Sequence, residues 1–296
     1  MARATSATIA LTALAMAAFA ANSLLCRAAL SDTLRAAHID PASFGAIRVT
    51  SGALVLACAM RLRSRPAAAP DWRAAVMLFA YVAAFSFAYL TLPAGTGALI
   101  LFGAVQLTMF AAGLARGERF ALAGWAGLAL AAAGLVVLVL PGVAAPPPGG
   151  AALMAVAGAA WGAYSLRGRG VPDPLAATAS NFLLALPLAL LLGAVFVARA
   201  HADVAGVLLA IASGALTSGL GYVIWYAALR GLSALQAASV QLSVPVIAAC
   251  GGTLWLDEAF TPRLAVAVVA ILGGIALVLT DRARGRIGPG TGHRAS

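Results

Sequence analysis

The sequence predicts an all-α membrane protein with ten transmembrane helices, arranged as two inverted repeats of five helices. Three observations support this prediction. Hydrophobic residues make up 63% of the 296 residues and charged residues only 9%, whereas soluble domains carry about 25% charged residues. Ten apolar runs are each long enough to cross a bilayer, and the two halves of the chain resemble each other.

The ten candidate spans follow one another with mostly short connections. Each has about the 17 to 25 residues that a transmembrane helix needs. They lie at 7–26, 42–60, 74–92, 94–115, 121–140, 150–166, 175–198, 204–227, 233–256 and 264–280. Pro93 separates the third span from the fourth, and Arg230, Gly231 and Leu232 form a hairpin between the eighth and the ninth. The first run also resembles a signal peptide ending near Cys26, but its length and the spans that follow favour an uncleaved helix.

A proline- and glycine-rich segment at 141–149 divides the chain into halves of similar length. We therefore predict a first five-helix repeat at 7–140, a linker at 141–149, a second five-helix repeat at 150–280, and a disordered basic tail at 281–296. The halves match at several places: Glu118 follows the fourth span as Glu258 follows the ninth. Because five is odd, the second half must enter the membrane from the opposite side, so the repeats are inverted.

The distribution of arginines predicts the orientation, since cytoplasmic loops carry an excess of basic residues. With a cytoplasmic N-terminus, the inside loops and tails hold Arg3, Arg61, Arg63, Arg65, Arg73, Arg116, Arg119, Arg167, Arg169, Arg230, Arg282, Arg284, Arg286 and Arg294. The outside loops hold only Arg27, Arg35, Arg199 and Arg263. Both termini are therefore expected in the cytoplasm. The net charge of +10 reflects these short loop clusters, so nucleic acid is not expected as a partner.

Polar and aromatic side chains inside the apolar spans are the candidates for a substrate site, because polar groups are costly in hydrocarbon and usually face a protein interior or a cavity. The cavity candidates are Asn22, Arg48, Gln106, Trp161, Tyr164, Asn181, Tyr222, Gln236 and Gln241. The hinge or gate candidates are Pro245, Tyr89, Tyr226, Glu118 and Glu258. For each amide the alternative is a hydrogen bond between helices, and for the tyrosines of the eighth span it is the interfacial belt.

Arg48 has two interpretations. An arginine inside a span costs about 2.5 to 3.5 kcal/mol on insertion scales, so something must compensate its charge. In the first, it binds a substrate carboxylate or phosphate. In the second, it has a structural role, with its charge at the outer interface or on backbone carbonyls. Its position near the outer end of the span favours the structural role. Glu118 and Glu258 pair with the nearby Arg119 and Arg263, or they gate access at opposite faces.

These residues, with the order of the spans, resemble EamA-type proteins of the drug/metabolite transporter superfamily. The resemblance covers about residues 7 to 280 and is carried by Arg48, by Trp161-Gly-Ala-Tyr164, by the run from Tyr226 to Glu258 with Pro245 inside it, and by Gly273-Gly274. It implies a ten-helix inner-membrane carrier of small metabolites that acts as an exporter. The chain departs from the family in having Phe19-Ala20 where Trp-Gly is common, and no proline in the fourth span.

The expected function is secondary transport of amino-acid-like or similar polar solutes by alternating access, without cofactor or metal. A channel, a non-transporting scaffold and a carrier of cationic drugs are the alternatives. An enzyme is not expected, because the sequence contains no HExxH or GxSxG motif and its histidines lie in loops or the tail. The expected partners are a small-molecule substrate and the lipid bilayer. A coupling proton, and the choice between a monomer and a homodimer, stay open.

Overall fold

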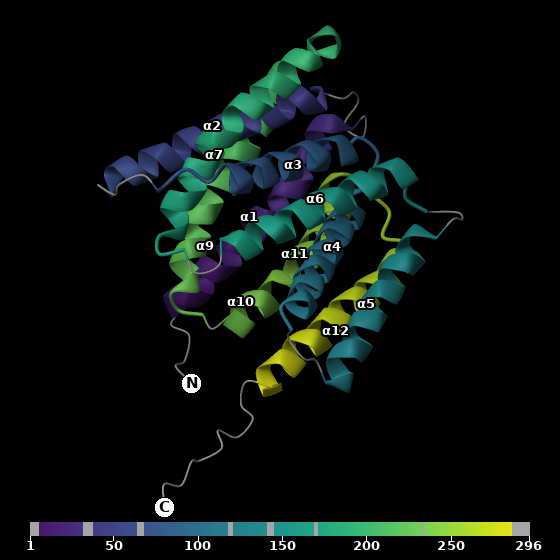
Figure 1. Cartoon of the computed structure of the whole chain (residues 1–296). Coiled ribbons are helices and arrows are strands. Elements are labelled where there is room, and N and C mark those ends of the chain that lie inside the picture. The colour runs from purple at the N-terminus through teal and green to yellow at the C-terminus, as the bar shows by residue number, and fades with distance from the viewer. Residues whose placement is uncertain are drawn as a thin grey trace, which may run out of the picture.

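The computed structural model describes residues 6–31, 38–63, 68–117, 121–140, 145–168, 171–232 and 234–285. Within these ranges every regular element is helical (Figure 1). The elements are α1 (Ser6–Leu30), α2 (Pro41–Leu62), α3 (Trp72–Ala88), α4 (Ala94–Ala115), α5 (Leu122–Val139), α6 (Pro148–Arg167), α7 (Pro174–Val195), η2 (Val197–Arg199), α8 (Val204–Ala212), η3 (Ser213–Leu220), α9 (Gly221–Leu229), α10 (Ala234–Gln241), α11 (Ser243–Trp255) and α12 (Pro262–Gly285).

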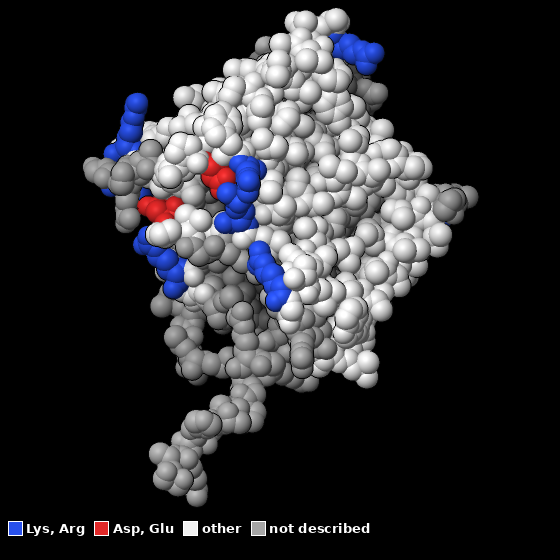
Figure 2. Space-filling view, in the orientation of Figure 1, with Lys and Arg blue, Asp and Glu red and all other residues white. Residues whose placement is uncertain are grey.

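Among the described residues, eight helices are long and apolar enough to cross a membrane, and α8, η3 and α9 count as one of them. Two further apolar helices, Trp72–Ala88 and Ser239–Trp255, are shorter. Many large apolar side chains lie on the surface, among them Val195 and Val269, as expected where lipid replaces water. Figure 2 shows a broad uncharged face, with most of its charged side chains gathered toward one side of the view.

The structure differs from the predicted spans at several places, and α1, for example, runs to Leu30 instead of ending at residue 26. α3 ends at Ala88 instead of at residue 92, so Tyr89 is its C-cap and residues 90–92 form a turn. The residue directly before Pro93 is disfavoured in helical geometry. The ninth predicted span is interrupted at Leu242, close to Pro245, whose missing N–H disrupts the helical hydrogen bonds. The last helix continues through Gly285, five residues into the segment predicted as a tail.

The helices pack in reciprocal pairs. α3 packs on α6 much as α9 packs on α1, and α4 packs on α6 as α11 packs on α1. Three further pairs, α2 with α7, α5 with α12 and α4 with α11, join helices that hold the same place in the two predicted repeats. In Figure 1, α5 and α12 lie side by side at the edge of the bundle, and the start of α1 and the end of α12 lie on the same side.

Aspartates cap the second and third helices of each half. Asp40 Oδ1 accepts from the backbone N–H groups of Ala42 and Ser43 at 3.0 and 2.9 Å, before the proline that opens α2. Asp173 caps α7 in the same way, again directly before a proline. Asp71 and Asp203 cap α3 and α8. Such caps satisfy amide groups that have no partner within the helix, and here they occur at corresponding places in both halves.

Close backbone contact between α5 and α12 depends on glycine, as is common where membrane helices pack. A Cβ added to Gly274 would overlap the carbonyl oxygen of Gly127 and would lie 2.6 Å from the amide nitrogen of Ala131. A Cβ added to the neighbouring Gly273 would meet no described atom within 4 Å.

We therefore expect Gly274→Ala to destabilise the protein by about 1 to 3 kcal/mol, because these backbone atoms must separate to admit a methyl group. Gly273→Ala is the matched control, and alanine's better helix propensity should leave the stability unchanged or slightly higher. Thermal unfolding of the two detergent-purified variants provides the comparison. Equal melting temperatures would show that the close contact does not hold α5 and α12 together.

Candidate functional site

A cluster of buried polar side chains lies where α1 and α2 meet η3, and Tyr81 on α3 reaches it. η3 is a π-helix, a rare conformation that is frequent at functional sites. Asn22 on α1 reaches it: its Oδ1 accepts from Ser213 Oγ at 2.7 Å and from Thr217 Oγ1 at 3.1 Å. All three side chains are buried. The amide of Asn22 thus joins the first half of the chain to the irregular helix of the second half.

Arg48 on α2 belongs to the same cluster and is almost fully buried, with 2% of its surface exposed. Its Nη2 donates to Tyr81 Oη at 2.9 Å and its Nε to Ser218 Oγ at 3.3 Å. The guanidinium carbon lies 5.2 Å from the centre of the Tyr81 ring and 4.9 Å from that of Phe85. Nη1 has no hydrogen-bond partner among the described residues. The charge therefore lies deep inside the bundle, held by neutral groups and ring faces.

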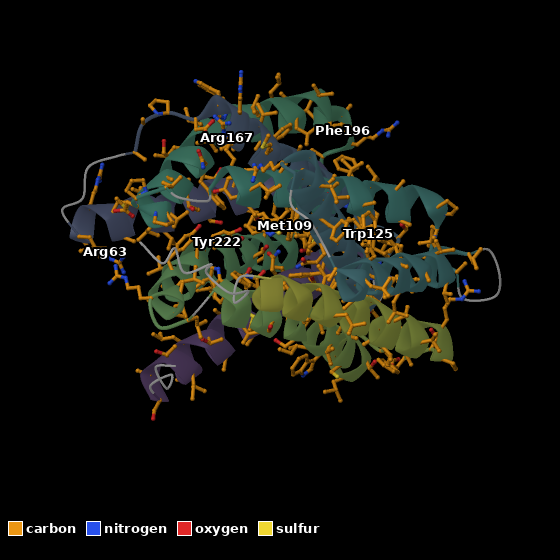
Figure 3. The ribbon with its side chains drawn as sticks, turned by 60° about the horizontal axis from the view of Figure 1, so that its bottom comes forward. Arg63, Met109, Trp125, Arg167, Phe196 and Tyr222 are labelled. Atoms are coloured by element: carbon orange, nitrogen blue, oxygen red, sulfur yellow. The ribbon has the colours of Figure 1, made fainter. Side chains whose placement is uncertain are left out.

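Aromatic rings extend from this polar cluster across the bundle. Tyr81 lies 4.9 Å from Trp161 on α6, centroid to centroid, and Trp161 stacks on Tyr164 and Tyr222 at 5.4 and 5.7 Å. Tyr222 stacks in turn on Tyr226, at 6.1 Å. In Figure 3, Tyr222 lies within the bundle, whereas Arg63 lies at its edge. These rings offer an amphipathic wall next to the polar cluster.

A second polar group lies beyond these rings. Asn181 on α7 donates to Tyr164 Oη at 3.4 Å, and Thr178 Oγ1 lies 2.8 Å from Tyr226 Oη. Tyr226 is only partly buried, and its hydroxyl bonds the buried Thr178. Arg48 and Asn181 each lie seven residues after the proline that begins their helix, Pro41 or Pro174. The two predicted repeats thus carry different polar groups at the same distance from the proline.

Ion pairs tie the helices together at the two ends of α3. At its C-terminal end, Glu258 Oε1 accepts from Arg27 Nε at 3.1 Å and its Oε2 from the amide N–H of Ala94 at 2.8 Å. Arg27 also donates to the carbonyl oxygens of Tyr89 and Leu90. This arrangement corrects the expected pairing of Glu258 with Arg263, which instead bonds the carbonyl of Leu140. Partial burial raises the pKa of Glu258 although Arg27 opposes the shift.

At the N-terminal end of α3, Arg167 from the last turn of α6 pairs with Asp71. The hydrogen bond from Arg167 lowers the pKa of Asp71. α1 and α6 therefore each carry an arginine in the last turn that pairs with an acid at one end of α3.

The structure brings six of the predicted cavity residues together and places others elsewhere. The six are Asn22, Arg48, Trp161, Tyr164, Asn181 and Tyr222. Gln106 instead lines a hollow between α4, α5 and α12, and Gln241 is half-buried at the end of α10. Pro245 is buried in α11, and Tyr89 is buried with its hydroxyl on the carbonyl of Ala94. Glu118 and the side chain of Gln236 lie outside the described residues.

Four contributors were missed by the sequence reasoning: Tyr81, Ser213, Thr217 and Ser218. Hydroxyl residues are common in apolar helices, where they bond the backbone of the preceding turn, and Thr217 does so to Ser213. The available signal was the segment SGALTSG, in which three hydroxyl residues stand close together among glycine and alanine. Among the described residues no group of three possible metal ligands occurs.

Comparisons with known proteins agree with this architecture. The model of the EamA-like transporter family matches residues 148–280. An uncharacterized protein of Pseudomonas aeruginosa is 58% identical over 277 residues, covering 93% of this chain and 95% of that protein. A solved crystal structure of a protein at 22% identity covers 95% of this chain and 100% of its own, with a TM-score of 0.64; at that identity the likeness concerns the fold.

Proposed function

This chain belongs to the EamA-like transporter family, and from that membership we propose that it is a secondary carrier that moves small polar metabolites across the cell's inner membrane by alternating access. The observation that carries the proposal is the buried cluster of Asn22, Arg48, Tyr81 and the hydroxyls of η3, next to stacked rings. Carrier sites are typically built at the interface of two repeats, on irregular helices near the bilayer midplane.

The proposed topology has ten spans in two inverted repeats, at 7–140 and 150–280. It is supported by the reciprocal packing of α3 on α6 and α9 on α1, and by the aspartate caps at corresponding helices. In this proposal the two shorter apolar helices, Trp72–Ala88 and Ser239–Trp255, are the remaining two spans. Neighbouring helices can satisfy the backbone polar groups that a helix break frees inside a bundle. Both termini lie in the cytoplasm in this proposal, because the arginine-rich loops then face inward. Export as the net direction rests on the family resemblance.

The two ion pairs support alternating access. In the proposed orientation Glu258 and Arg27 close the outer end, and Arg167 and Asp71 close the inner end. We propose that the arrangement with both pairs formed is the occluded state of the carrier. Opening toward one side then needs the rupture of one pair while the other stays formed, which is the behaviour that a carrier requires and a channel does not.

The test is counterflow in proteoliposomes, with a solute identified by comparing the metabolites released by cells with and without the protein. Saturable counterflow is expected. Asn22→Ala should reduce it by at least about tenfold, since removing the amide leaves the buried hydroxyl of Ser213 without its acceptor, at about 1 to 3 kcal/mol, and breaks the link from α1 to Thr217. Gln106→Ala, another amide-to-alanine change but beside the separate hollow, is the control and should transport normally.

Each alternative has its own outcome. Flux that never saturates would indicate a channel, and the absence of any flux from well-folded protein would indicate a scaffold. Normal counterflow in Asn22→Ala, together with loss in Gln106→Ala, would place the substrate in the hollow between α4, α5 and α12 instead of the central cluster.

A further inference from the structure

We propose that Arg48 binds the carboxylate of a monoanionic or zwitterionic organic acid, which is the substrate class of the central cluster. This inference rests on the proposed function for the location of the site, but it concerns the chemistry of the ligand. It starts from the one buried side-chain nitrogen of the described residues that lacks a partner, Arg48 Nη1.

The charge of Arg48 is not neutralised by the protein that the structure describes. No ion pair among the described residues involves it, and its two hydrogen-bond partners are the neutral hydroxyls of Tyr81 and Ser218. A buried charge without a counterion is costly, and helix packing alone would be served as well by a neutral side chain. An anionic ligand would supply the missing counterion and the missing acceptor together.

The hydrogen-bonding capacity of the cluster also favours an anion. Asn22 Oδ1 is already occupied by Ser213 and Thr217. Tyr81 Oη accepts from Arg48 Nη2 and, at 3.5 Å, from Asn22 Nδ2, so its own proton is left to donate. Within the described part of the chain, Arg48 Nη1 therefore has no acceptor and the Tyr81 hydroxyl has its proton left to donate, while Asn22 Oδ1 and Tyr81 Oη each already accept two hydrogen bonds. Such a donor-rich site suits a carboxylate and disfavours a cation.

The surroundings limit the charge and shape of the ligand. Arg48 is the only cation of the cluster among the described residues, so one negative charge balances it, whereas a phosphate dianion would leave a net negative charge in the interior. Trp161 lies next to Tyr81 at 4.9 Å and stacks on Tyr222. These ring faces suit the apolar part of the acid, and they also attract an ammonium group by cation–π interaction. A 2-amino acid and a simple carboxylic acid are thus two forms of the same ligand chemistry.

The experiment measures binding to the purified full-length protein by thermal shift, with acids and their neutral amides as probes. The pairs are acetate with acetamide, benzoate with benzamide, L-alanine with L-alaninamide, and L-phenylalanine with L-phenylalaninamide, each titrated to millimolar concentrations. At least one acid should raise the melting temperature while its amide does not. Protection by amino acids alone would identify the zwitterionic form, and protection by simple acids too would identify the carboxylate as sufficient.

Arg48→Met and Arg48→Gln should weaken the binding of the protective acid by about a hundredfold, the effect expected when one partner of a buried charge pair is removed. Arg48→Lys keeps the charge but not the planar fork and should bind with intermediate affinity. Arg63→Gln, which removes a charge at the exposed end of the same helix, is the matched control and should bind normally. Without ligand, the melting temperature of Arg48→Met should equal or exceed that of the wild type, because an uncompensated charge has been removed.

Two results would overturn the inference: no acid protects the wild-type protein in preference to its amide, or Arg48→Met keeps acid binding. A large loss of melting temperature in both Arg48→Met and Arg48→Gln, with acid binding unchanged in Arg48→Lys, would assign Arg48 to the structural role instead. Failure of the proposed function gives a different result. Binding of acids without counterflow would contradict the carrier function and support the carboxylate site. Saturable counterflow of an uncharged solute, insensitive to acids, would support the carrier function and contradict the carboxylate site.

Discussion

Replacing Gly214 with valine is expected to abolish transport and to lower the stability of the protein by about 3 kcal/mol or more. Gly214 lies in η3, where the π-helix crosses α2 most closely. A Cβ at this position would overlap both Ser51 Oγ and the carbonyl oxygen of Arg48, and it would lie 2.9 Å from the carbonyl carbon of Arg48. The contacts with Arg48 are with backbone, so a rotamer change cannot relieve them, and η3 must move away from α2.

That movement would also dismantle the site. Arg48 bonds Ser218 on η3, and Asn22 bonds Ser213 and Thr217 on the same segment. A displacement of about 1 Å breaks hydrogen bonds of this length. Gly214→Ala should show an intermediate loss, since its side chain is smaller than that of valine.

The matched control is Gly193→Val in α7, where an added Cβ meets no described atom within 4 Å. It should leave both the melting temperature and counterflow unchanged. The test compares Gly214→Val, Gly214→Ala and Gly193→Val by thermal unfolding and by proteoliposome counterflow. Retention of wild-type transport by Gly214→Val would mean that the close approach of η3 to α2 is not needed for function.

Neutralising Glu258 is expected to open the outer end of the bundle. Its carboxylate bonds both Arg27 and the first amide of α4, so it joins three segments there. Glu258→Gln removes the charge and keeps the shape. Cys26, fully buried and adjacent to Arg27 on α1, is a natural reporter of opening. In a background of Cys58→Ala and Cys250→Ala, a membrane-impermeant maleimide should label Cys26 about tenfold faster in Glu258→Gln, the effect of losing about 1.4 kcal/mol that favours closure.

Asp257→Asn is the control for this change. It removes the same charge at the neighbouring, exposed residue, and asparagine tolerates the positive φ of 54° that this position adopts. Labelling at the wild-type rate is expected. Equal labelling of Cys26 in the wild type and in Glu258→Gln would show that the Arg27–Glu258 pair does not gate the outer end.

The pH dependence follows from the same carboxylate. Partial burial raises the pKa of Glu258, so protonation begins at a higher pH than for an ordinary glutamate. Below that pKa the neutral acid no longer pairs with Arg27, and the outer end should open. As the external pH falls through the raised pKa of Glu258, the labelling rate of the wild type should therefore approach that of Glu258→Gln measured at the same pH. The ratio of the two labelling rates, wild type over Glu258→Gln at each pH, cancels the effect of pH on the maleimide reaction itself. A ratio that stays constant would exclude Glu258 as the proton-sensitive group.

Local sequence features predicted the helical segments well but not their irregularities. The turn at 230–232 lies where the hairpin was expected, and Arg48 and Asn22 were recognised because a polar group in an apolar run is conspicuous. The π-helix was not foreseen, although Gly, Ser and Thr are dense in its sequence. An i→i+5 pattern differs from an α-helix by one inserted residue, and hydrophobic periodicity cannot resolve that difference over a single turn.

Composition and span length by themselves determined that this chain is a helical membrane protein with arginine-rich loops, because transfer of apolar and charged groups between water and lipid depends on residue type alone. The tertiary structure decided which polar groups meet. Glu258 pairs with Arg27, 231 residues away in the sequence, and not with the nearby Arg263. Gln106 lines a hollow away from the cluster that holds Asn22, although both are amides in apolar spans. Which face of a helix meets which neighbour depends on close packing at residues such as Gly214, and that packing leaves the buried Nη1 of Arg48 without a partner in the described part of the chain.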